Sequence, residues 1–304
     1  MRTIFDFLIF PGLLFTATMG LLVSWIDRKI TARIQWRKGP VWYQDFVDFI
    51  KLFKKEIITP PQIPKIIFFI SPFLALVSVT LISLLVGRAI INPQGGFLGD
   101  LVIVFFLSII PVIVAVAGGK ASGNSLVSIG TLYRAKFILS YELPFILCCL
   151  IPIIKSGGLI KIGEIINYQI GYRSVAGSFS GTIAFILAII CLQAKLGFTP
   201  FDAIETEQQI IPTPYTEYSG LLLAVFRLVR SMLLFILPVF LIAIFWMSSL
   251  RIQSLALKYT LLLIIIILIK NTNPRAKLRQ ALKFFLGPIT LSAVVAIVLA
   301  ILGK

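Results

Sequence analysis

The stretch SGLLLAVFRLVRSMLLFILPVFLIA, residues 219–243, is an apolar run of membrane-spanning length. The hydrocarbon core of a bilayer is about 30 Å thick, and a helix needs roughly 20 apolar residues to cross it. The rest of the chain has a similar character, because 59% of its 304 residues are hydrophobic and 13% are charged, with a mean hydropathy of +1.02. Charged side chains are too few to cover a soluble globule of this size, so the composition predicts an integral membrane protein.

Seven further stretches near this length accompany the run. The eight predicted spans are residues 5–26, 66–87, 97–117, 137–154, 179–196, 219–243, 254–270 and 284–302. They lack the alternation of apolar and polar residues that is typical of a β-barrel strand, and a helix satisfies its backbone hydrogen bonds within the segment. The sequence therefore predicts an all-α integral membrane protein with eight transmembrane helices, which form a single transmembrane domain over residues 1–304.

The segment after the first span predicts one more helix, which lies along the cytoplasmic interface. Apolar residues from Trp42 to Ile57 recur at helical spacing, and a polar stripe that includes Asp45 and Asp48 lies opposite them. A helix with these two faces buries its apolar face at the headgroup boundary and keeps its polar face in water.

The net charge of +16 is explained by Lys and Arg residues in the loops of a membrane protein rather than by a nucleic-acid-binding surface. A basic domain outside the membrane would be needed to present such a surface, and the eight spans leave no soluble domain over. If the first helix runs from outside to inside, most Lys and Arg residues fall in the inner loops. The positive-inside rule then predicts a multi-pass protein with both termini outside the cytoplasm.

The residue types that usually hold metals are missing or unsuitably spaced. The sequence has no histidine, and its three cysteines, Cys148, Cys149 and Cys191, show no CxxC spacing. Neither an iron–sulfur nor a zinc site can be built from them. We therefore expect no metal and no cofactor on this chain, and proton transfer must use carboxylates, lysines or tyrosines.

Glu142 is an acid inside a predicted span, within the sequence SYELP. A charge at the bilayer centre costs roughly 2.5–3.5 kcal/mol even on the insertion scale, so a merely anchoring span would not keep it. Arg227 and Arg230, three residues apart on one face of another span, are the expected counter-charges. A carboxylate held between desolvation and a guanidinium can change protonation state when its surroundings change, which makes Glu142 a candidate proton relay.

The loop GFTPFDAIETEQQIIPTPYTEYSG, residues 197–220, holds four of the twelve acids of the chain. These acids are Asp202, Glu205, Glu207 and Glu217. Thr199 as N-cap and Pro200 at the first helical position predict a helix start, where the helix dipole favours an anion. In that helix Asp202 and Glu205, three residues apart, would share one face, and Glu207 would lie on another face.

Two other loops carry charge. The outer segment 155–174 mixes charged, apolar and glycine residues and predicts a solvated connector. The last inner loop, residues 270–288, holds Arg275, Lys277 and Arg279 without an acid. Membrane topology alone accounts for this cluster, and docking of a soluble partner is the alternative.

Four motifs, one in each predicted cytoplasmic loop, resemble those of a known family. They are DRKITARIQWRKGP (residues 27–40), GNSLVSIGTLYRAKFILSYELP (123–144), PFDAIETEQQIIPTPYTEYSG (200–220) and NPRAKLRQALKFFLGP (273–288). The chain resembles the membrane subunit that joins the two arms of respiratory complex I, called the H subunit in bacteria and subunit 1 in mitochondria. It looks closer still to the counterpart in energy-converting membrane-bound hydrogenases and related ferredoxin-dependent sulfur reductases. The motifs occur in order over nearly the whole length, and PFD followed by EYSG is highly specific.

The resemblance implies a non-catalytic subunit without a redox centre, in a hetero-oligomeric complex of a prokaryotic cytoplasmic membrane. A peripheral module of hydrogenase-like catalytic and iron–sulfur subunits would dock on its cytoplasmic loops and oxidise ferredoxin. Iron–sulfur clusters, and a nickel–iron centre in a hydrogenase, would belong to those partners. Antiporter-like membrane subunits and lipid are the other implied partners, and no nucleic acid is expected.

The positions of the motifs assign roles to residues under this resemblance. Docking of the redox module, and the cavity below it, would fall to Arg28, Arg33, Arg37 and Arg275. The proton relay toward the ion-translocating subunits would consist of Glu142, Asp202, Glu205, Glu207 and Glu217. No catalytic residue and no metal ligand is implied, so the expected role is to relay redox-driven protonation changes.

Two departures from the complex I pattern favour the hydrogenase and sulfur-reductase branch. Asp27 stands where complex I usually has a glutamate, and AKLGFTPFD (residues 194–202) replaces a run of the type ETNRAPFD. The alternative is the quinone-site-forming H subunit of an NADH:quinone oxidoreductase. A passive membrane anchor is a second alternative, and a secondary transporter is disfavoured because its halves should repeat. The residues leave open the terminal electron acceptor and the choice between sodium and protons.

Overall fold

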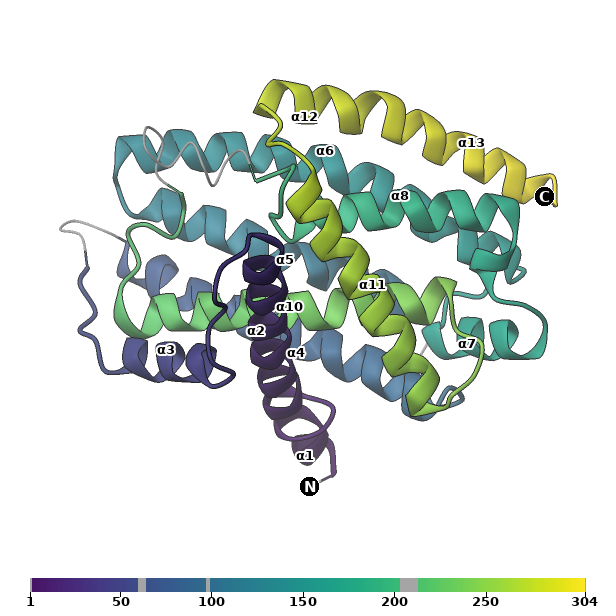
Figure 1. The fold of residues 1–304 in the computed structure, drawn as a ribbon, viewed down its shortest axis with the longest axis horizontal. Coiled ribbons are helices and arrows are strands. Elements are labelled where there is room, and N and C mark those ends of the chain that lie inside the picture. The colour runs from purple at the N-terminus through teal and green to yellow at the C-terminus, as the bar shows by residue number, and fades with distance from the viewer. Residues whose placement is uncertain (1, 60–63, 97–98, 203–212, 304) are drawn as a thin grey trace. The chain divides into compact units, whose positions relative to one another are not determined.

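The computed structural model describes residues 2–59, 64–96, 99–202 and 213–303, and within these ranges the regular elements are helical. The elements are α1 (Arg2–Leu8), α2 (Leu13–Ile34), α3 (Gln44–Phe53), α4 (Lys65–Ile91), α5 (Asp100–Ala121), α6 (Ser125–Lys155), α7 (Ile162–Gly171), η1 (Val175–Gly177), α8 (Phe179–Lys195), α10 (Gly220–Phe245), α11 (Ile252–Thr272), α12 (Leu278–Phe284), η3 (Phe285–Ile289) and α13 (Thr290–Ile301) (Figure 1). The all-α prediction is confirmed.

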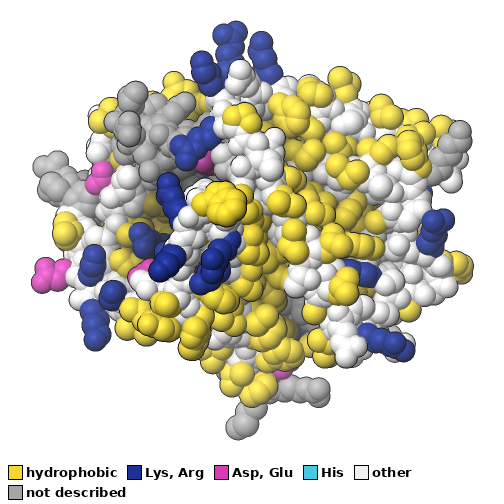
Figure 2. Space-filling model, in the orientation of Figure 1, with side chains coloured by type: hydrophobic (Ala, Val, Ile, Leu, Met, Phe, Trp, Pro, Cys, Tyr) yellow, Lys and Arg dark blue, Asp and Glu magenta, His cyan; other side chains and the backbone are white. Residues whose placement is uncertain are grey.

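The predicted membrane spans match the helices of the structure. Seven apolar helical stretches in the described residues are long enough to cross a membrane, and α8 adds a shorter apolar helix of 17 residues. At 1.5 Å per residue, α8 is about 25 Å long. Large apolar side chains such as Ile66, Phe106 and Leu139 are exposed, and Figure 2 shows apolar side chains over much of the visible face. Such a surface is typical of a protein in lipid.

The chain divides into two compact units. The first comprises residues 1–83, 107–136 and 202–236, and the second comprises residues 84–106, 137–201 and 237–304. Four of the five boundaries fall within α4, α5, α6 and α10, and the fifth lies between Phe201 and Asp202. That the chain forms one transmembrane domain stays a prediction, and each unit is described by itself below.

In the first unit, α2 packs closely on α10. A Cβ atom added at Gly20 would lie only 2.7 Å from the backbone oxygen of Ser231, so the absence of a side chain lets the two backbones approach. The rings of Phe15 and Phe235 meet edge to face with centroids 5.9 Å apart. These contacts fix the part of α10 that carries the two arginines predicted as counter-charges.

The predicted interfacial helix is present as α3, which is shorter than the stripe from Trp42 to Ile57. The chain leaves the helix after Phe53, ahead of Pro60. Two of its apolar side chains, Ile50 and Phe53, are exposed, whereas Leu52 is buried. This exposure suits a helix that faces lipid, whereas its cytoplasmic position stays a prediction.

In the second unit, residues 155–174 are not the solvated connector that their charges predicted. They contain α7, which buries Ile162, Ile165 and Ile166 along one face. The side chain of Gln169 is buried too, and it donates a hydrogen bond to the carbonyl oxygen of Ala243 (2.9 Å) and accepts one from the N–H of Met247 (3.0 Å). The prediction was wrong because the isoleucines recur at helical spacing, which outweighs the scattered charges.

The last helices of the second unit pack through small residues. α13 lies against α8, and its buried residues are Ala293, Ala296 and Ala300. The five residues of η3, just before α13, form a π-helical turn. The Thr290 hydroxyl donates a hydrogen bond to the carbonyl oxygen of Phe285 at 2.6 Å, which helps to satisfy the backbone of this wider turn.

Candidate functional site: a buried ion pair and the loops around it

A charged pair buried in the second unit joins α6 to α8. Glu142 lies within α6, and Lys195 is the last residue of α8. The Lys195 Nζ atom lies 2.7 Å from Oε1 and 3.0 Å from Oε2 of Glu142. The exposed fractions of the two side chains are 1% for Lys195 and 7% for Glu142, so water contributes little to the solvation of either charge. The amine of Lys195 is therefore a counter-charge of Glu142.

The surroundings of this pair are apolar and polarisable. The Lys195 Nζ atom lies 4.6 Å from the centroid of the Phe145 ring, within the range of a cation–π contact. Cys149 and Cys191 are buried thiols in the same unit. Because such surroundings screen charge weakly, the pair interacts more strongly than an ion pair in water would.

Sequence analysis missed Lys195 because it sits at the end of a span, where a lysine is usually solvated. Lys195 could have been predicted from Glu142, because a charged residue inside a span is usually paired with an opposite charge. The predicted counter-charges, Arg227 and Arg230, belong to the first unit, and their pairing with Glu142 stays a prediction.

An aromatic cluster connects the PFD motif to the helical turn that carries Glu142. The ring centroid of Phe201 lies 4.7 Å from that of Phe285, in η3. Phe285 lies 6.2 Å from Tyr141, the residue before Glu142. Phe137, one turn earlier in α6, contacts both Tyr141 and Phe285. The loop motif and the buried acid are thus linked through packed rings.

The final loop motif also contacts the PFD motif. The backbone N–H of Ala276 donates a hydrogen bond to the carbonyl oxygen of Pro200 at 2.9 Å. The Lys270 Nζ atom lies 4.5 Å from the centroid of the Phe198 ring. Two of the motifs that suggested the family are therefore joined within the second unit.

The acidic loop is described only in part. Glu205 and Glu207 lie outside the described residues. Residues 199–201 form a turn and a bend, so the helix start predicted at Thr199 and Pro200 is wrong. Asp202 is half-buried, and one of its carboxylate oxygens is shielded from solvent.

Glu217, at the end of the same loop, is held by the loop between α5 and α6. Its Oε1 atom accepts a hydrogen bond from the side-chain amide of Asn124 at 2.8 Å. The next residue, Tyr218, is buried, stacks on Phe68 with centroids 4.2 Å apart, and donates its hydroxyl to the Phe68 carbonyl oxygen at 3.2 Å. Burial raises the pKa of Tyr218 to about 12 against a smaller lowering by a hydrogen bond from Ser71, so the hydroxyl keeps its proton at neutral pH.

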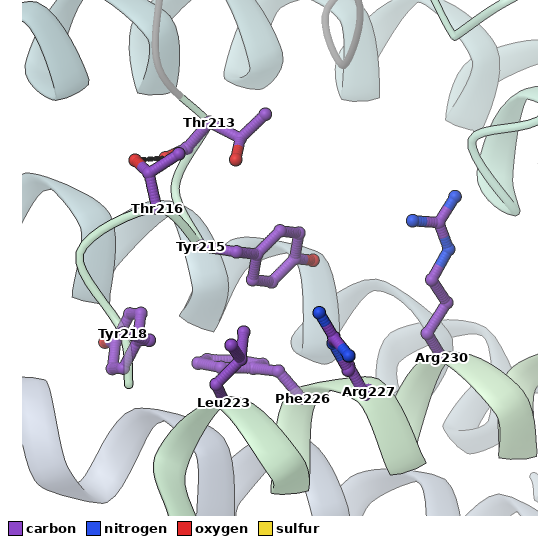
Figure 3. A pocket seen from close by; sticks show the side chains of 8 residues that line it. All are labelled: Thr213, Tyr215, Thr216, Tyr218, Leu223, Phe226, Arg227 and Arg230. Atoms are coloured by element: carbon purple, nitrogen blue, oxygen red, sulfur yellow. Dashed lines mark hydrogen bonds between the residues drawn. The ribbon is translucent and has the colours of Figure 1, made fainter. Parts of the chain in front are cut away.

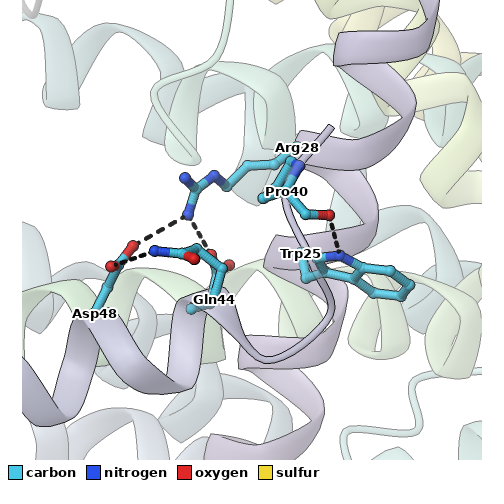
Figure 4. A network of polar contacts seen from close by, with 6 residues as sticks. Trp25, Arg28, Pro40, Gln44 and Asp48 are labelled. Carbon is cyan, nitrogen blue, oxygen red and sulfur yellow. Dashed lines mark hydrogen bonds and ion pairs between the residues drawn. The ribbon is translucent and has the colours of Figure 1, made fainter. Parts of the chain in front are cut away.

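The first loop forms a polar network between α2 and α3 (Figure 4). The guanidinium of Arg28 pairs with Asp45 and lies 3.7 Å from Asp48. The Gln44 side chain donates a hydrogen bond to Asp48 at 2.9 Å, and the Trp25 indole donates one to the carbonyl oxygen of Pro40 at 3.1 Å. Asp45 is buried while Arg28 is about half exposed, so this pair attaches α3 to α2 and keeps one cation at the surface.

The other arginines predicted to dock a partner also lie at the surface. Arg33, Arg37 and Arg275 are exposed. Trp36, between the first two, is almost fully exposed and has a positive backbone φ of 57°. The structure does not test whether these side chains contact a partner, so their docking role stays a prediction.

Arg227 and Arg230 line a pocket in the first unit, together with residues of the loop before α10 (Figure 3). Both guanidiniums project from α10 toward the space beside Tyr215. The pocket has a volume of about 340 Å³, and the lining residues are Thr213, Tyr215, Thr216, Tyr218, Leu223, Phe226, Arg227 and Arg230. Sequence reasoning found the two arginines but not the pocket, because the loop that closes it has no sequence periodicity.

The described residues contain no group of three or more His, Cys, Asp or Glu side chains placed to hold a metal ion. Cys148, Cys149 and Cys191 are buried free thiols. The ionisable groups that the described site brings together are the carboxylate of Glu142 and the amine of Lys195.

Three comparisons relate the chain to known proteins. The family model described as NADH dehydrogenase matches residues 8–301. The H subunit of NADH-quinone oxidoreductase from Carboxydothermus hydrogenoformans is 31% identical over 217 residues, which cover 69% of this chain and 60% of that relative. A chain in the structure of the membrane-bound sulfane sulfur reductase, an archaeal respiratory membrane complex, matches with a TM-score of 0.81 and 27% identity, over 95% of this chain and 96% of that chain.

Proposed function

This chain belongs to the NADH dehydrogenase family, and we propose that it is the non-redox membrane subunit of a ferredoxin-oxidising, ion-pumping respiratory complex of the sulfane sulfur reductase or hydrogenase type. Its role is to dock the peripheral redox module and to relay changes in carboxylate protonation to ion-translocating subunits. The match over nearly the full length to a chain of the sulfane sulfur reductase supports this branch of the family.

The observation that carries the relay is the buried pair of Glu142 and Lys195. Uptake of a proton by Glu142 removes the negative charge that holds the Lys195 amine 2.7 Å away. The lysine is then a buried cation without its counter-charge, and such a charge is strongly destabilised. One proton therefore changes the electrostatic balance between α6 and α8, which is what a relay element requires.

Coupling to the redox module runs through the packed rings. A shift of the acidic loop during electron transfer would move Phe201, which contacts Phe285. Phe285 contacts Tyr141, next to Glu142, so the shift reaches the ion pair by direct packing. Dense interiors transmit such displacements because they contain few voids to absorb them.

Docking of the module rests on the exposed cations of the first and last loops. Arg28, Arg33, Arg37 and Arg275 present guanidiniums that match carboxylates on a partner. The energy comes from the partner's electron transfer, since moving one charge against 100 mV costs about 2.3 kcal/mol. Iron–sulfur clusters in the docked subunits, and a nickel–iron centre in a hydrogenase, would carry those electrons.

The test is the Glu142→Gln variant of the whole complex in proteoliposomes, with reduced ferredoxin as electron donor. Acceptor reduction and ion uptake are measured in parallel, with a pH-sensitive dye for protons and radioactive sodium for Na⁺. Glu164→Gln is the matched control, because Glu164 also pairs with a lysine, Lys161 at 3.0 Å, but is partly exposed in α7. We expect Glu142→Gln to keep electron transfer and lose ion uptake, and the control to keep both. Normal pumping by Glu142→Gln would instead identify the chain as a passive anchor.

A quinone-reducing complex is the second candidate, supported by the 31% identity to the H subunit of an NADH-quinone oxidoreductase. The purified complex would then reduce a soluble quinone at a rate that saturates with quinone concentration. Reduction of sulfur compounds or protons in the same preparation, with no quinone reduction, would exclude this candidate.

A further inference from the structure

Asn124 stands directly before α6, which begins at Ser125. The backbone N–H of Ser128 donates a hydrogen bond to the Asn124 carbonyl oxygen at 3.0 Å. The side-chain oxygen Oδ1 of Asn124 accepts another from the N–H of Leu126, also at 3.0 Å. An asparagine in this position stabilises a helix, because it satisfies one of the N–H groups that have no partner within the first turn. Asn124 is therefore the N-cap of α6.

The same side chain has a second partner, far away in the sequence. The Nδ2 atom of Asn124 donates a hydrogen bond to Oε1 of Glu217 at 2.8 Å, across 93 positions. Both ends of one amide group are thus in use, since its oxygen caps α6 and its nitrogen holds a carboxylate. The carboxylate lies beside the start of a helix, where the helix dipole favours an anion.

The main chain around Glu217 is held against α5 in the first unit. A Cβ atom added at Gly118 would lie 2.0 Å from the hydroxyl oxygen of Tyr218, and one added at Gly119 would lie 2.8 Å from Pro214. The two glycines therefore let the loop approach α5 closely on both sides of the acid. Because this backbone is already in place, the contact with Asn124 forms at a low cost in chain entropy.

We propose that Asn124 is a positioning residue that couples the charge of Glu217 to the first turn of α6, the helix that carries Glu142. An amide N–H donates a stronger hydrogen bond to a carboxylate than to a neutral carboxyl group. The first turn of α6 is therefore firmest while Glu217 is ionised, and uptake of a proton from water by this carboxylate loosens it. The coupling is reciprocal, so opening of this turn favours uptake of a proton by Glu217. Its use in ion transport rests on the proposed function, whereas the coupling itself does not.

The experiment measures hydrogen exchange by mass spectrometry in peptides covering residues 122–129 of the purified complex. The variants are Asn124→Asp, Glu217→Gln and the two together. Aspartate caps a helix as well as asparagine does, so Asn124→Asp keeps the cap and replaces the donor toward Glu217 by an acceptor. The double variant again has one donor and one acceptor, with their positions exchanged and with the net charge of the wild type.

We expect each single variant to exchange about fivefold faster than the wild type, because a hydrogen bond to a charged group is stronger than a neutral one by about 1 kcal/mol. The double variant should return to about the wild-type rate. The matched control is Ser178→Asp, at the N-cap of α8, where the side chain accepts a hydrogen bond from the N–H of Gly181. This control places the same added charge at another helix start, and exchange in its own first turn should not become faster.

Exchange of Asn124→Asp at the wild-type rate would overturn the proposal, because it would show that Asn124 only caps α6. Failure of the double variant to slow down again would overturn it too. If Asn124→Asp does not assemble, Asn124→Ser decides, since serine caps a helix but is too short to reach Glu217. Faster exchange of Asn124→Ser then supports the coupling, and unchanged exchange contradicts it.

Ion uptake by the double variant in proteoliposomes tests the proposed function separately. Wild-type hydrogen exchange together with lost ion uptake supports both the coupling and a relay that needs the Glu217 carboxylate. Wild-type exchange together with normal ion uptake supports the coupling and removes Glu217 from the relay.

Discussion

Replacement of Lys195 by methionine is the sharpest perturbation of the candidate site. Methionine is close in length to lysine and suits an apolar site, so the variant removes the charge with little change of volume. Glu142 then keeps a buried carboxyl whose two oxygens have lost the amine at 2.7 and 3.0 Å. We expect the variant protein to open more readily around α6 and α8.

The size of the effect follows from the burial of the pair. Removal of one partner of a buried ion pair typically costs about 3–5 kcal/mol, whereas replacement of both partners is often nearly neutral. With a tenfold change for every 1.4 kcal/mol, the single variant should open roughly 150 to 4,000 times more often. The double variant Glu142→Gln with Lys195→Met should stay within about tenfold of the wild type.

The buried cysteines supply the assay. Cys149 is fully buried and lies seven residues after Glu142, two turns further along the same face of α6. Its alkylation by a maleimide in the detergent-solubilised complex, followed by mass spectrometry of this chain's peptides, reports the opening rate. Two results would show that the ion pair does not hold α6 to α8. One is alkylation of Cys149 in Lys195→Met at the wild-type rate. The other is alkylation of Cys149 in the double variant with a rate increase equal to the product of the increases in the two single variants.

Three further predictions concern the framework. Arg28→Ala should release α3, so that trypsin cleaves this helix about fivefold faster, because a part-exposed ion pair such as Arg28–Asp45 contributes about 1 kcal/mol. Trypsin cleavage of α3 at the wild-type rate would show that the pair with Asp45 does not attach the helix. Gly20→Ala should lower the thermal midpoint of the complex through an overpacking cost of about 1–3 kcal/mol, while Gly171→Ala, whose added Cβ meets nothing within 4 Å, should not; equal midpoints would refute the close backbone contact. Gln169→Leu should destabilise the second unit by about 1–3 kcal/mol, because its two buried backbone partners lose their hydrogen bonds; a denaturation midpoint unchanged from wild type would argue against this contact.

The membrane helices could be predicted from sequence because each is a local property. A span needs about 20 apolar residues in a row, and no knowledge of its neighbours is required. The position of Glu142 inside a span was predictable for the same reason, since the free-energy cost of its charge there depends on its own place in the sequence. The structure places it in α6 as expected.

The partners of these residues could not be predicted, because they depend on contacts between distant segments. Glu142 and Lys195 are 53 positions apart, and Lys195 by itself looks like an ordinary loop cation. Arg227 and Arg230 were found by their charge, but the pocket around them is closed by a loop whose path has no repeating pattern. The local capping pattern predicted that a helix starts at Thr199 and Pro200. The structure has a turn at these two residues, and the next residue, Phe201, packs on the distant Phe285.

The π-helical turn at residues 285–289 sets the rotational phase of everything after it. A π turn contains one residue more than an α turn, and one residue corresponds to about 100° of rotation around a helix axis. If the same residues formed an α turn here, Ala293, Ala296 and Ala300 would rotate away from α8, and bulkier side chains that now face outward would replace them. Homologues that lack this extra residue should therefore carry their small side chains one position earlier along the final helix.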